Sequence, residues 1–272
     1  MRSKLAVASA AFLAASFGLA EAQGVNGFYV GGGAGASQQS SKTEYSVFPT
    51  SDSGLSSPSN LMSREWATGF VGVLSLGYGF GNGVRAELEG SFRTYQSDSA
   101  KAFNRTTNGG GTFNAYGAMF NVLYDIDLTR IGLNTRAVVP YVGAGLGYAL
   151  WQWQDVRGSV PLTAGGMATQ VIDDQQGRFS YQLIAGLAFP IEAVPGLSLT
   201  AEYRFMDDFE NPEMNVQVTN TRTGSTRPQT AVVSNRNQSV LLGLRYAFGA
   251  TPVVAPAAAP VAAAKTYLVF FD

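Results

Sequence analysis

The chain offers carboxylates and guanidinium groups for chemistry, but it has no imidazole and no thiol. Its 272 residues include 19 Asp and Glu and 18 Lys and Arg, with no His and no Cys. That composition excludes Ser-His-Asp and Cys-His catalysis, Cys or His metal sites and disulfides. A formal net charge of −1 provides no field that would attract nucleic acid. We therefore expect no cofactor, no nucleic-acid partner and few available enzyme chemistries.

The remaining charged groups alternate with apolar residues. From Val84 to Tyr95, Arg85, Glu87, Glu89 and Arg93 all lie at odd-numbered positions, and the positions between them are mostly apolar. Successive side chains of a strand point to opposite faces, so these four charges would share one face, whereas a helix would mix the two sets. The segment is predicted to be an amphipathic strand.

The same period recurs in eight segments. Six alternate clearly, and two are glycine-rich near-repeats that begin Tyr-Val-Gly: Trp66–Phe80, Val84–Tyr95, Tyr116–Tyr124, Phe179–Phe189, Leu197–Phe205 and Val240–Phe248, then Tyr29–Ala36 and Tyr141–Tyr148. Only 14% of residues are charged, against roughly 25% in soluble domains. A closed barrel is the one membrane-spanning solution without helices. The predicted fold is all-β, an eight-stranded antiparallel up-and-down transmembrane barrel; the alternative is a water-soluble barrel or sandwich.

The connections between these segments differ in length. Gly81–Gly83 and Pro190–Gly196 are short and 125–139 is of middling length, whereas 37–63, 96–111, 150–177 and 207–235 are long and polar. Short turns on one side and long loops on the other are typical of outer-membrane barrels. Aromatic residues near the strand ends, including Tyr95, Trp151 and Trp153, are expected at the lipid boundary, although the two Trp could instead bind a partner.

The inward faces carry balanced charge. The cations are Arg85, Arg93, Arg204 and Arg245, and the anions are Glu87, Glu89, Asp125 and Glu202. Eight strands enclose a lumen that side chains can fill, and buried ions are tolerable when they are paired. We expect a salt-bridged plug and a structural barrel; a narrow channel for ions or small solutes is the alternative.

Other chemistries have weaker support. An outer-membrane lipid-modifying enzyme lacks the His that Ser-His chemistry needs, and a carboxylate pair in a narrow lumen forms no accessible cleft. The Gly31–Ala36 segment fits a dinucleotide-binding pattern, but a polar loop follows it where a helix is required. The pairs Asp173-Asp174 and Asp207-Asp208, with Glu210, could bind calcium, but are expected to be solvated loop charges with no metal.

The two ends of the chain have their own composition. Arg2 and Lys4 precede an apolar stretch, and Ala20 and Ala22 form a small-x-small cleavage pattern, which predicts a signal peptide at 1–22. The barrel is then expected at 23–249. Residues 250–264 are rich in Ala and Pro, which predicts an extended linker.

This layout resembles the OmpA family of outer-membrane proteins. The resemblance rests on residues 115–125 and 141–148 and on the linker at 250–264. The resemblance implies that Tyr246 and Phe248 help the barrel-assembly machinery recognise the last strand. It also implies that 265–272 is the truncated first strand of a peptidoglycan-binding domain, so that peptidoglycan is a partner only if that domain exists. Lipopolysaccharide, phospholipid and periplasmic chaperones are the other expected partners. The expected location is the outer membrane, with the long loops extracellular and the C-terminus periplasmic. The expected function is to support envelope integrity.

Overall fold

The computed structural model describes most of the predicted barrel. The described residues are 25–39, 46–47, 59–60, 62–65, 67–96, 99–102, 105–108, 110–132, 137–161, 166–211, 213–232 and 234–249. The predicted signal peptide with Ala20 and Ala22, the linker at 250–264 and the segment 265–272 lie outside them. Within the described ranges, no helix has both the length and the apolar character needed to cross a membrane.

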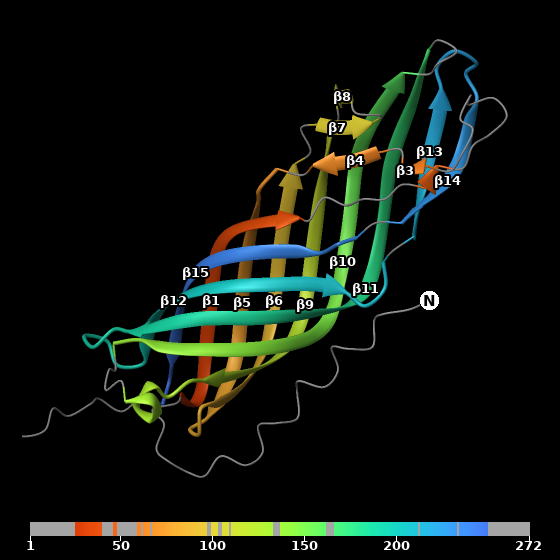
Figure 1. The fold of residues 1–272 in the computed structure, drawn as a ribbon. Coiled ribbons are helices and arrows are strands. Elements are labelled where there is room, and N and C mark those ends of the chain that lie inside the picture. Colours follow the sequence, from red (N-terminus) through yellow and green to blue (C-terminus); the bar gives the residue numbers. More distant parts are fainter. Residues whose placement is uncertain are drawn as a thin grey trace, which may run out of the picture.

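Eight long strands form a closed antiparallel barrel (Figure 1), which confirms the predicted fold class. They are β1 (Asn26–Gln39), β5 (Gly69–Phe80), β6 (Val84–Gln96), β9 (Gly110–Asp125), β10 (Val139–Pro161), β11 (Met167–Pro190), β12 (Leu197–Asp208) and β15 (Asn237–Ala247). Each strand pairs with its sequence neighbour among the eight. The first and last strands close the ring through pairs such as Tyr29 with Ala247.

The barrel turns its apolar face outward. Leu74 is 74% exposed and Leu88 is 63% exposed, whereas Arg85 and Glu89 on the opposite face are 2% and 4% exposed. A water-soluble barrel would bury the first set and expose the second. The alternation therefore identifies the outside as the surface for lipid and the inside as a polar lumen.

The two ends of the barrel differ. At the tight-turn end, Gly81–Gly83 joins β5 to β6, η1 (Leu128–Ile131) lies between β9 and β10, and residues 191–196 join β11 to β12. Gly81 and Gly83 have φ of 76° and 91°, a region that residues with a Cβ rarely adopt. The Asn82 side chain accepts a hydrogen bond from Val84 N at 3.0 Å, which completes the turn.

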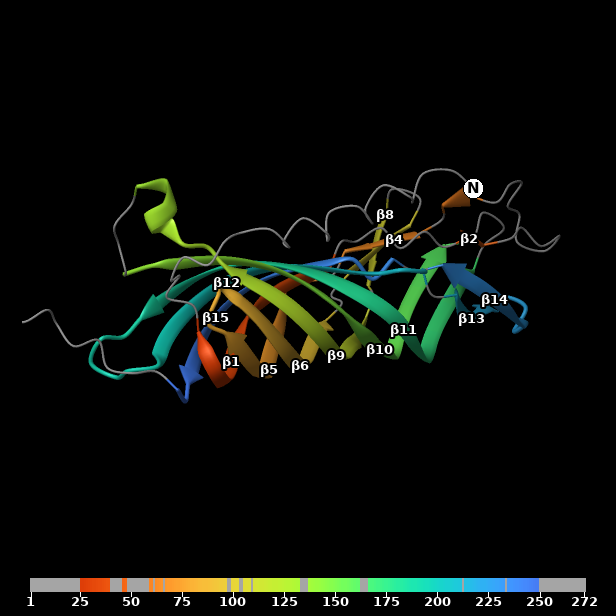
Figure 2. The same cartoon turned by 90° about the horizontal axis from the view of Figure 1, so that it is seen from below.

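At the opposite end, which we call the hairpin end, two of the predicted long loops are largely strand. β10 and β11 stay paired as far as Pro161 and Met167, and β13 (Glu213–Asn220) and β14 (Thr226–Val232) form a second hairpin against β11. The expectation that 150–177 and 207–235 are loops is thus wrong, because both segments consist largely of paired strands. Figures 1 and 2 show these strands continuing beyond the barrel wall on one side.

Short strands occupy the other connections at this end. They are β2 (Ser46–Val47), β3 (Ser59–Asn60), β4 (Met62–Glu65), β7 (Ser99–Ala102) and β8 (Arg105–Asn108). β2 pairs with β3, and β7 pairs with β4 and β8.

Two inward tyrosines lie over glycines of the neighbouring strand. Tyr29 is paired with Gly77, and Tyr141 is paired with Gly186. A Cβ built on either glycine would overlap the ring of its tyrosine. The glycines therefore make room for tyrosine rings inside the barrel.

We expect Gly186→Ala to destabilise the barrel by about 1–3 kcal/mol, because the added methyl displaces the Tyr141 ring from a packed site. Gly90→Ala is the matched control, since nothing lies within 4 Å of a Cβ at Gly90. Urea unfolding of each variant in lipid vesicles measures the difference. An equal loss in both variants would contradict the packing role.

Candidate functional site: the barrel lumen

The lumen near the tight-turn end holds a buried ion pair. Arg85 on β6 donates from Nε and Nη2 to Asp125 Oδ1 on β9 at 3.0 and 2.8 Å. The two side chains are 2% and 4% exposed. Arg85 Nη1 also donates to the Tyr29 hydroxyl at 3.2 Å, and its guanidinium carbon lies 4.9 Å from the Tyr141 ring centre. The pairing of β6 with β9, together with the hydrogen bond from the Asp125 N–H to the Gly83 carbonyl, places Arg85 and Asp125 side by side. Both side chains point inward next to the Gly81–Gly83 turn.

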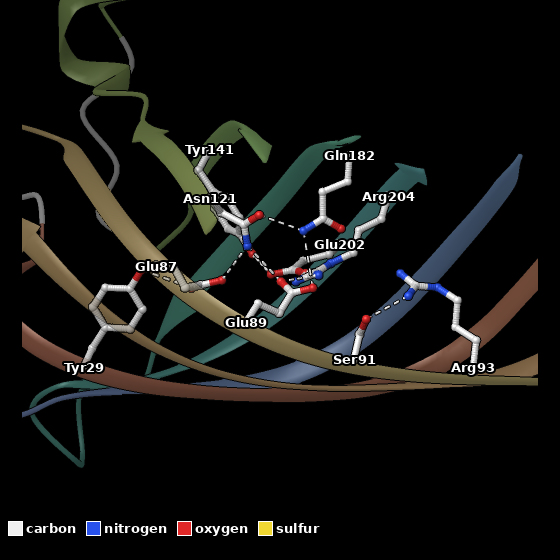
Figure 3. Close-up of polar contacts among 10 residues, drawn as sticks. All are labelled: Tyr29, Glu87, Glu89, Ser91, Arg93, Asn121, Tyr141, Gln182, Glu202 and Arg204. Carbon is white, nitrogen blue, oxygen red and sulfur yellow. Dashed lines mark hydrogen bonds and ion pairs between the residues drawn. The ribbon is translucent and has the colours of Figure 1, made fainter. Parts of the chain in front are cut away.

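Farther along the lumen, neutral amides connect two glutamates (Figure 3). Asn121 Nδ2 donates to Glu87 Oε1 at 3.2 Å and to Glu89 Oε2 at 2.9 Å. Gln182 Nε2 donates to the Asn121 carbonyl at 2.7 Å and to Glu89 Oε1 at 3.3 Å. Tyr29 donates to Glu87 at 3.0 Å. The amides thus separate two carboxylates that would otherwise repel one another.

Arg204 on β12 joins the two sides of the lumen. Its Nη1 forms an ion pair with Glu89 Oε2 of β6, and its Nη2 lies 2.6 Å from Glu202 Oε2. The Tyr141 hydroxyl donates to Glu202 Oε1 at 2.6 Å. One guanidinium therefore forms ion pairs with two carboxylates and connects β12 to β6 across the lumen.

The last two predicted cations are buried but less well paired. Arg93 is 0% exposed and donates from Nη1 to Ser91 at 2.9 Å, as Figure 3 shows, while its Nε and Nη2 have no hydrogen-bond partner among the described residues. Arg245 is 7% exposed, and its Nη1 has no such partner in the same part of the chain. All eight predicted charges thus lie at inward positions, but the hydrogen-bonded network joins six of them.

Four neutral residues complete the network without having been predicted as site residues: Tyr29, Asn121, Tyr141 and Gln182. Their inward parity was available from the sequence, since each lies on the side opposite the outward apolar residues of its strand. Charge alone selected the predicted set. Counting buried hydrogen-bond donors on the same face would have found the other four.

An aromatic cluster fills the lumen toward the hairpin end. Phe113 stacks on Trp151 with ring centres 5.5 Å apart and planes 2° apart, and it contacts Tyr95 at 5.5 Å and Trp153 at 5.0 Å. Trp151 and Tyr95 are 0% exposed. The prediction that Tyr95, Trp151 and Trp153 lie at the lipid boundary is therefore wrong, because their parity directs them inward.

Apolar residues of the barrel strands and of the hairpins extend this cluster, which we call the aromatic plug. Besides the four rings it contains Ala115, Met119, Ala149, Val156, Ile172, Met206 and Val216. A bulge between Trp153 and Val156, with Asp155 at φ 50°, keeps both residues on the buried side. The β10–β11 hairpin is thus packed onto the lumen contents, since its side chains are part of the plug.

The acidic residues at the end of β12 are also buried. Asp207 and Asp208 are 6% and 5% exposed, so the expectation of solvated loop charge is wrong for both. Asp208 accepts hydrogen bonds from Ser180 at 2.5 Å and Asn235 at 2.8 Å, and Asp207 accepts from Arg236 at 3.1 Å. These contacts attach the segment before β15 to the barrel rim.

A small cavity remains among the charged groups. It measures about 30 Å³ and is bounded by Tyr29, Arg85, Glu87, Tyr141 and Arg204, among others. A space of this size holds one or two water molecules. Side chains of the described residues thus occupy the lumen, with ionic contacts in one half and aromatic packing in the other.

These features define a β-barrel membrane protein with a filled lumen. The chain matches the outer membrane protein beta-barrel domain family over residues 5–248, and it belongs to that family. An outer membrane protein of Gluconacetobacter diazotrophicus is 35% identical over 280 residues, which span 100% of this chain and 72% of the relative. Membership confirms the prediction of an outer-membrane barrel.

Several solved structures are similar to the chain. Neisserial surface protein A is 22% identical with a TM-score of 0.42, covering 83% of this chain and 99% of that chain. A major outer membrane protein from Thermus thermophilus is 14% identical with a TM-score of 0.40, covering 80% and 97%. The outer membrane protease OmpT from Escherichia coli is 10% identical with a TM-score of 0.36, covering 82% and 97%.

We expect Asp125→Asn to destabilise the barrel by about 3–5 kcal/mol, because it leaves the buried Arg85 without its counter-charge. The same substitution at Asp155, whose ion pair with Arg157 has side chains 63% and 72% exposed, should cost about 1 kcal/mol or less. Urea unfolding in vesicles compares the two. A small loss at Asp125 would show that the pair contributes little.

The placement of the aromatic plug predicts a fluorescence result. In Trp66→Phe, the two remaining tryptophans are Trp151 and Trp153, and lipids with brominated chains should quench them weakly because the barrel wall separates them from lipid. Adding Tyr246→Trp, at an outward position 39% exposed, supplies a lipid-facing control. Strong quenching without the added tryptophan would contradict the inward placement.

Proposed function

We propose that this chain is a closed, non-conducting barrel that anchors a β-hairpin platform in the outer membrane and supports the envelope as a structural element. The observation that carries the proposal is the filled lumen, with the Arg204 ion pairs in one half and the stacked Phe113 and Trp151 rings in the other. A structural barrel needs no open path through its lumen. The lumen residues are explained by their contacts with one another. The charges stabilise the interior of the protein.

The contacts argue against a channel for solutes. A conducting lumen needs a continuous aqueous path whose charged groups face water, as in barrels of about 16–18 strands. Here Glu89 and Arg204 are each 4% exposed and are bonded to one another. Passage of an ion would require breaking this pair and moving the aromatic plug as well.

The contacts also argue against enzyme activity. Glu87 and Glu89 lie on the lumen face of one strand, but both accept hydrogen bonds from the Asn121 amide and are 7% and 4% exposed. A glycosidase needs two carboxylates on either side of an accessible bond. Among the described residues, the cavity beside Glu87 measures about 30 Å³, which is too small for such a substrate.

The hairpins at 139–190 and 213–232 are the parts that the barrel presents at the hairpin end. We infer that the hairpin end is extracellular and the tight-turn end periplasmic, since long connections of barrels face outward from the cell. The predicted signal peptide and the OmpA-like layout of the C-terminal segment accord with export. Barrel-assembly machinery, chaperones and outer-membrane lipids are the expected partners, with Tyr246 and Phe248 lying on the outer face at the end of β15 and beyond it.

Planar-bilayer recording tests the closed state. The wild-type chain should insert without a steady conductance, whereas Trp151→Ala combined with Arg204→Ala should conduct, because it removes volume from both halves of the lumen. Leu244→Ala, at a lipid-facing position 53% exposed, is the control and should stay silent.

Two outcomes would overturn the proposal. A steady wild-type conductance of the same size as that of the double variant would show an open lumen. A double variant that folds, as judged by its heat-dependent mobility in gels, yet stays silent would show that these two side chains do not close the barrel.

A further inference from the structure

Buried oxygen atoms gather at the hairpin-end rim of the barrel, where β1 and β12 end and β15 begins. β15 lies between β1 and β12 in the wall (Figure 1). Gln39, the last residue of β1, is paired with Asn237, the first residue of β15. Asn235, just before β15, is bonded to Asp208 at the end of β12. These four side chains are thus gathered around the segment 234–237.

Three amides of this group have a fixed orientation. Gln39 Nε2 donates to the Ser234 carbonyl at 3.2 Å, and Asn235 Nδ2 donates to Asp208 Oδ2 at 2.8 Å. Asn237 Nδ2 donates to the Asn235 carbonyl at 3.2 Å. Each acceptor is a carbonyl or carboxylate oxygen, which only accepts, so turning any of these amides round would lose its hydrogen bond. The partners therefore assign the nitrogen and the oxygen of each amide.

The same amides leave their oxygens without a donor. Gln39 Oε1, Asn235 Oδ1 and Asn237 Oδ1 have no hydrogen-bond partner among the described residues. The three residues are 3%, 0% and 0% exposed. A buried oxygen without a positive partner is unfavourable, and native proteins rarely leave one so. Three of them around one short segment point to a bound group that attracts oxygen.

A carboxylate without a counter-charge lies beside these oxygens. Asp208 is 5% exposed, and its hydrogen-bond donors, Ser180 and Asn235, are both neutral. Arg236 pairs with Asp207 at 3.1 Å, and within the described ranges Asp208 has no ion pair of its own. A buried charge is tolerated when it is paired. A cation would therefore satisfy both the oxygens and the charge, whereas a water molecule would satisfy only the oxygens.

The ligand types select the kind of cation. Carboxylate and amide carbonyl oxygens are ligands of calcium, which takes about 6–8 of them and leaves room for water. Magnesium loses its water reluctantly, and transition metals favour the imidazole and thiolate that this chain lacks. No group of three acidic side chains among the described residues is placed to hold a metal, so most ligands at the rim are neutral.

We propose that the rim binds one calcium ion through the Asp208 carboxylate and the side-chain oxygens of Gln39, Asn235 and Asn237. The ion joins the end of β1, the end of β12 and the start of β15, so it fastens the rim where the first and last strands of the barrel meet. Binding is weak, with a Kd of about 10⁻⁴–10⁻³ M as in extracellular calcium modules, because only one ligand is charged. The inference goes beyond the proposed function and does not depend on a closed lumen.

Equilibrium dialysis of the full chain against radiolabelled calcium tests the site. The protein is refolded in a neutral detergent without lipopolysaccharide, so that lipid phosphates do not contribute. The wild type should bind one calcium per chain, and an equal concentration of magnesium should displace little of it. Asp208→Asn should weaken binding at least ten-fold. Gln39→Met, which keeps the length of the side chain and removes its oxygen, should weaken binding several-fold.

Matched controls separate the rim from other acidic and amide groups. Asp173→Asn changes an exposed carboxylate on β11, and Gln238→Met changes an exposed amide next to Asn237. Both should bind calcium as the wild type does. Heat-dependent mobility in gels shows which variants fold, and Gln39→Met carries the test if Asp208→Asn does not.

Two outcomes would overturn the proposal. A wild type that retains no calcium at millimolar concentrations would leave water as the partner of the buried oxygens. Binding that falls equally in the rim variants and in the controls, or in neither, would place the ion elsewhere. The conductance measured in the bilayer experiment has no bearing on either outcome.

Discussion

The structure depends on one constraint, which is that every backbone N–H and C=O of a membrane-crossing strand must be hydrogen-bonded within the protein. The pairing of β1 with β15 closes the ring that the other seven pairings build, so each of the eight barrel strands is paired on both sides. Closure with eight strands then fixes the lumen at a width that side chains fill. A lumen of that width cannot hold bulk water, so any charge inside it must find a protein partner.

The charge network follows from that lack of water. Arg85 and Asp125, both nearly unexposed, bind one another through two nitrogens, and Arg204 forms ion pairs with Glu89 and Glu202. Neutral amides do the same work where charges of one sign meet, as Asn121 does between Glu87 and Glu89. Because these partners come from different strands, each contact also fixes the distance between walls. The network thus connects the walls of the closed barrel, and the eight predicted inward charges sum to zero only when Arg93 and Arg245 are counted with it.

The sequence could predict the fold because apolar residues alternate with other residues along each strand, and the apolar residues are those that face outward. Leu74, Leu88 and Leu242 all lie outward as their parity requires, and the count of eight strands follows from segments of this kind. The same parity placed all eight charged residues in the lumen. Which of them bind one another could not be predicted, because that depends on the register and stagger of strands far apart in sequence. Arg204 reaches Glu89 across more than a hundred residues, and nothing local to either residue records this contact.

The wrong predictions share one cause, which is that the type of a residue was taken to show where it lies in the protein. Trp151 and Trp153 were assigned to the lipid boundary because tryptophan is common there, although their positions on β10 are inward ones, in step with Tyr141 and Ala149. Polar residues at 150–177 suggested a loop, yet a hairpin beyond the membrane is exposed to water on its outer side and needs no apolar face there. Its inner side carries Val156 and Ile172, and these pack with Trp151 in the aromatic plug. The hairpin is stable as strand because it extends the hydrogen-bonding of the barrel wall and covers the lumen at the same time. The β10–β11 hairpin, which continues beyond the barrel wall, is therefore held by the packing of the barrel interior.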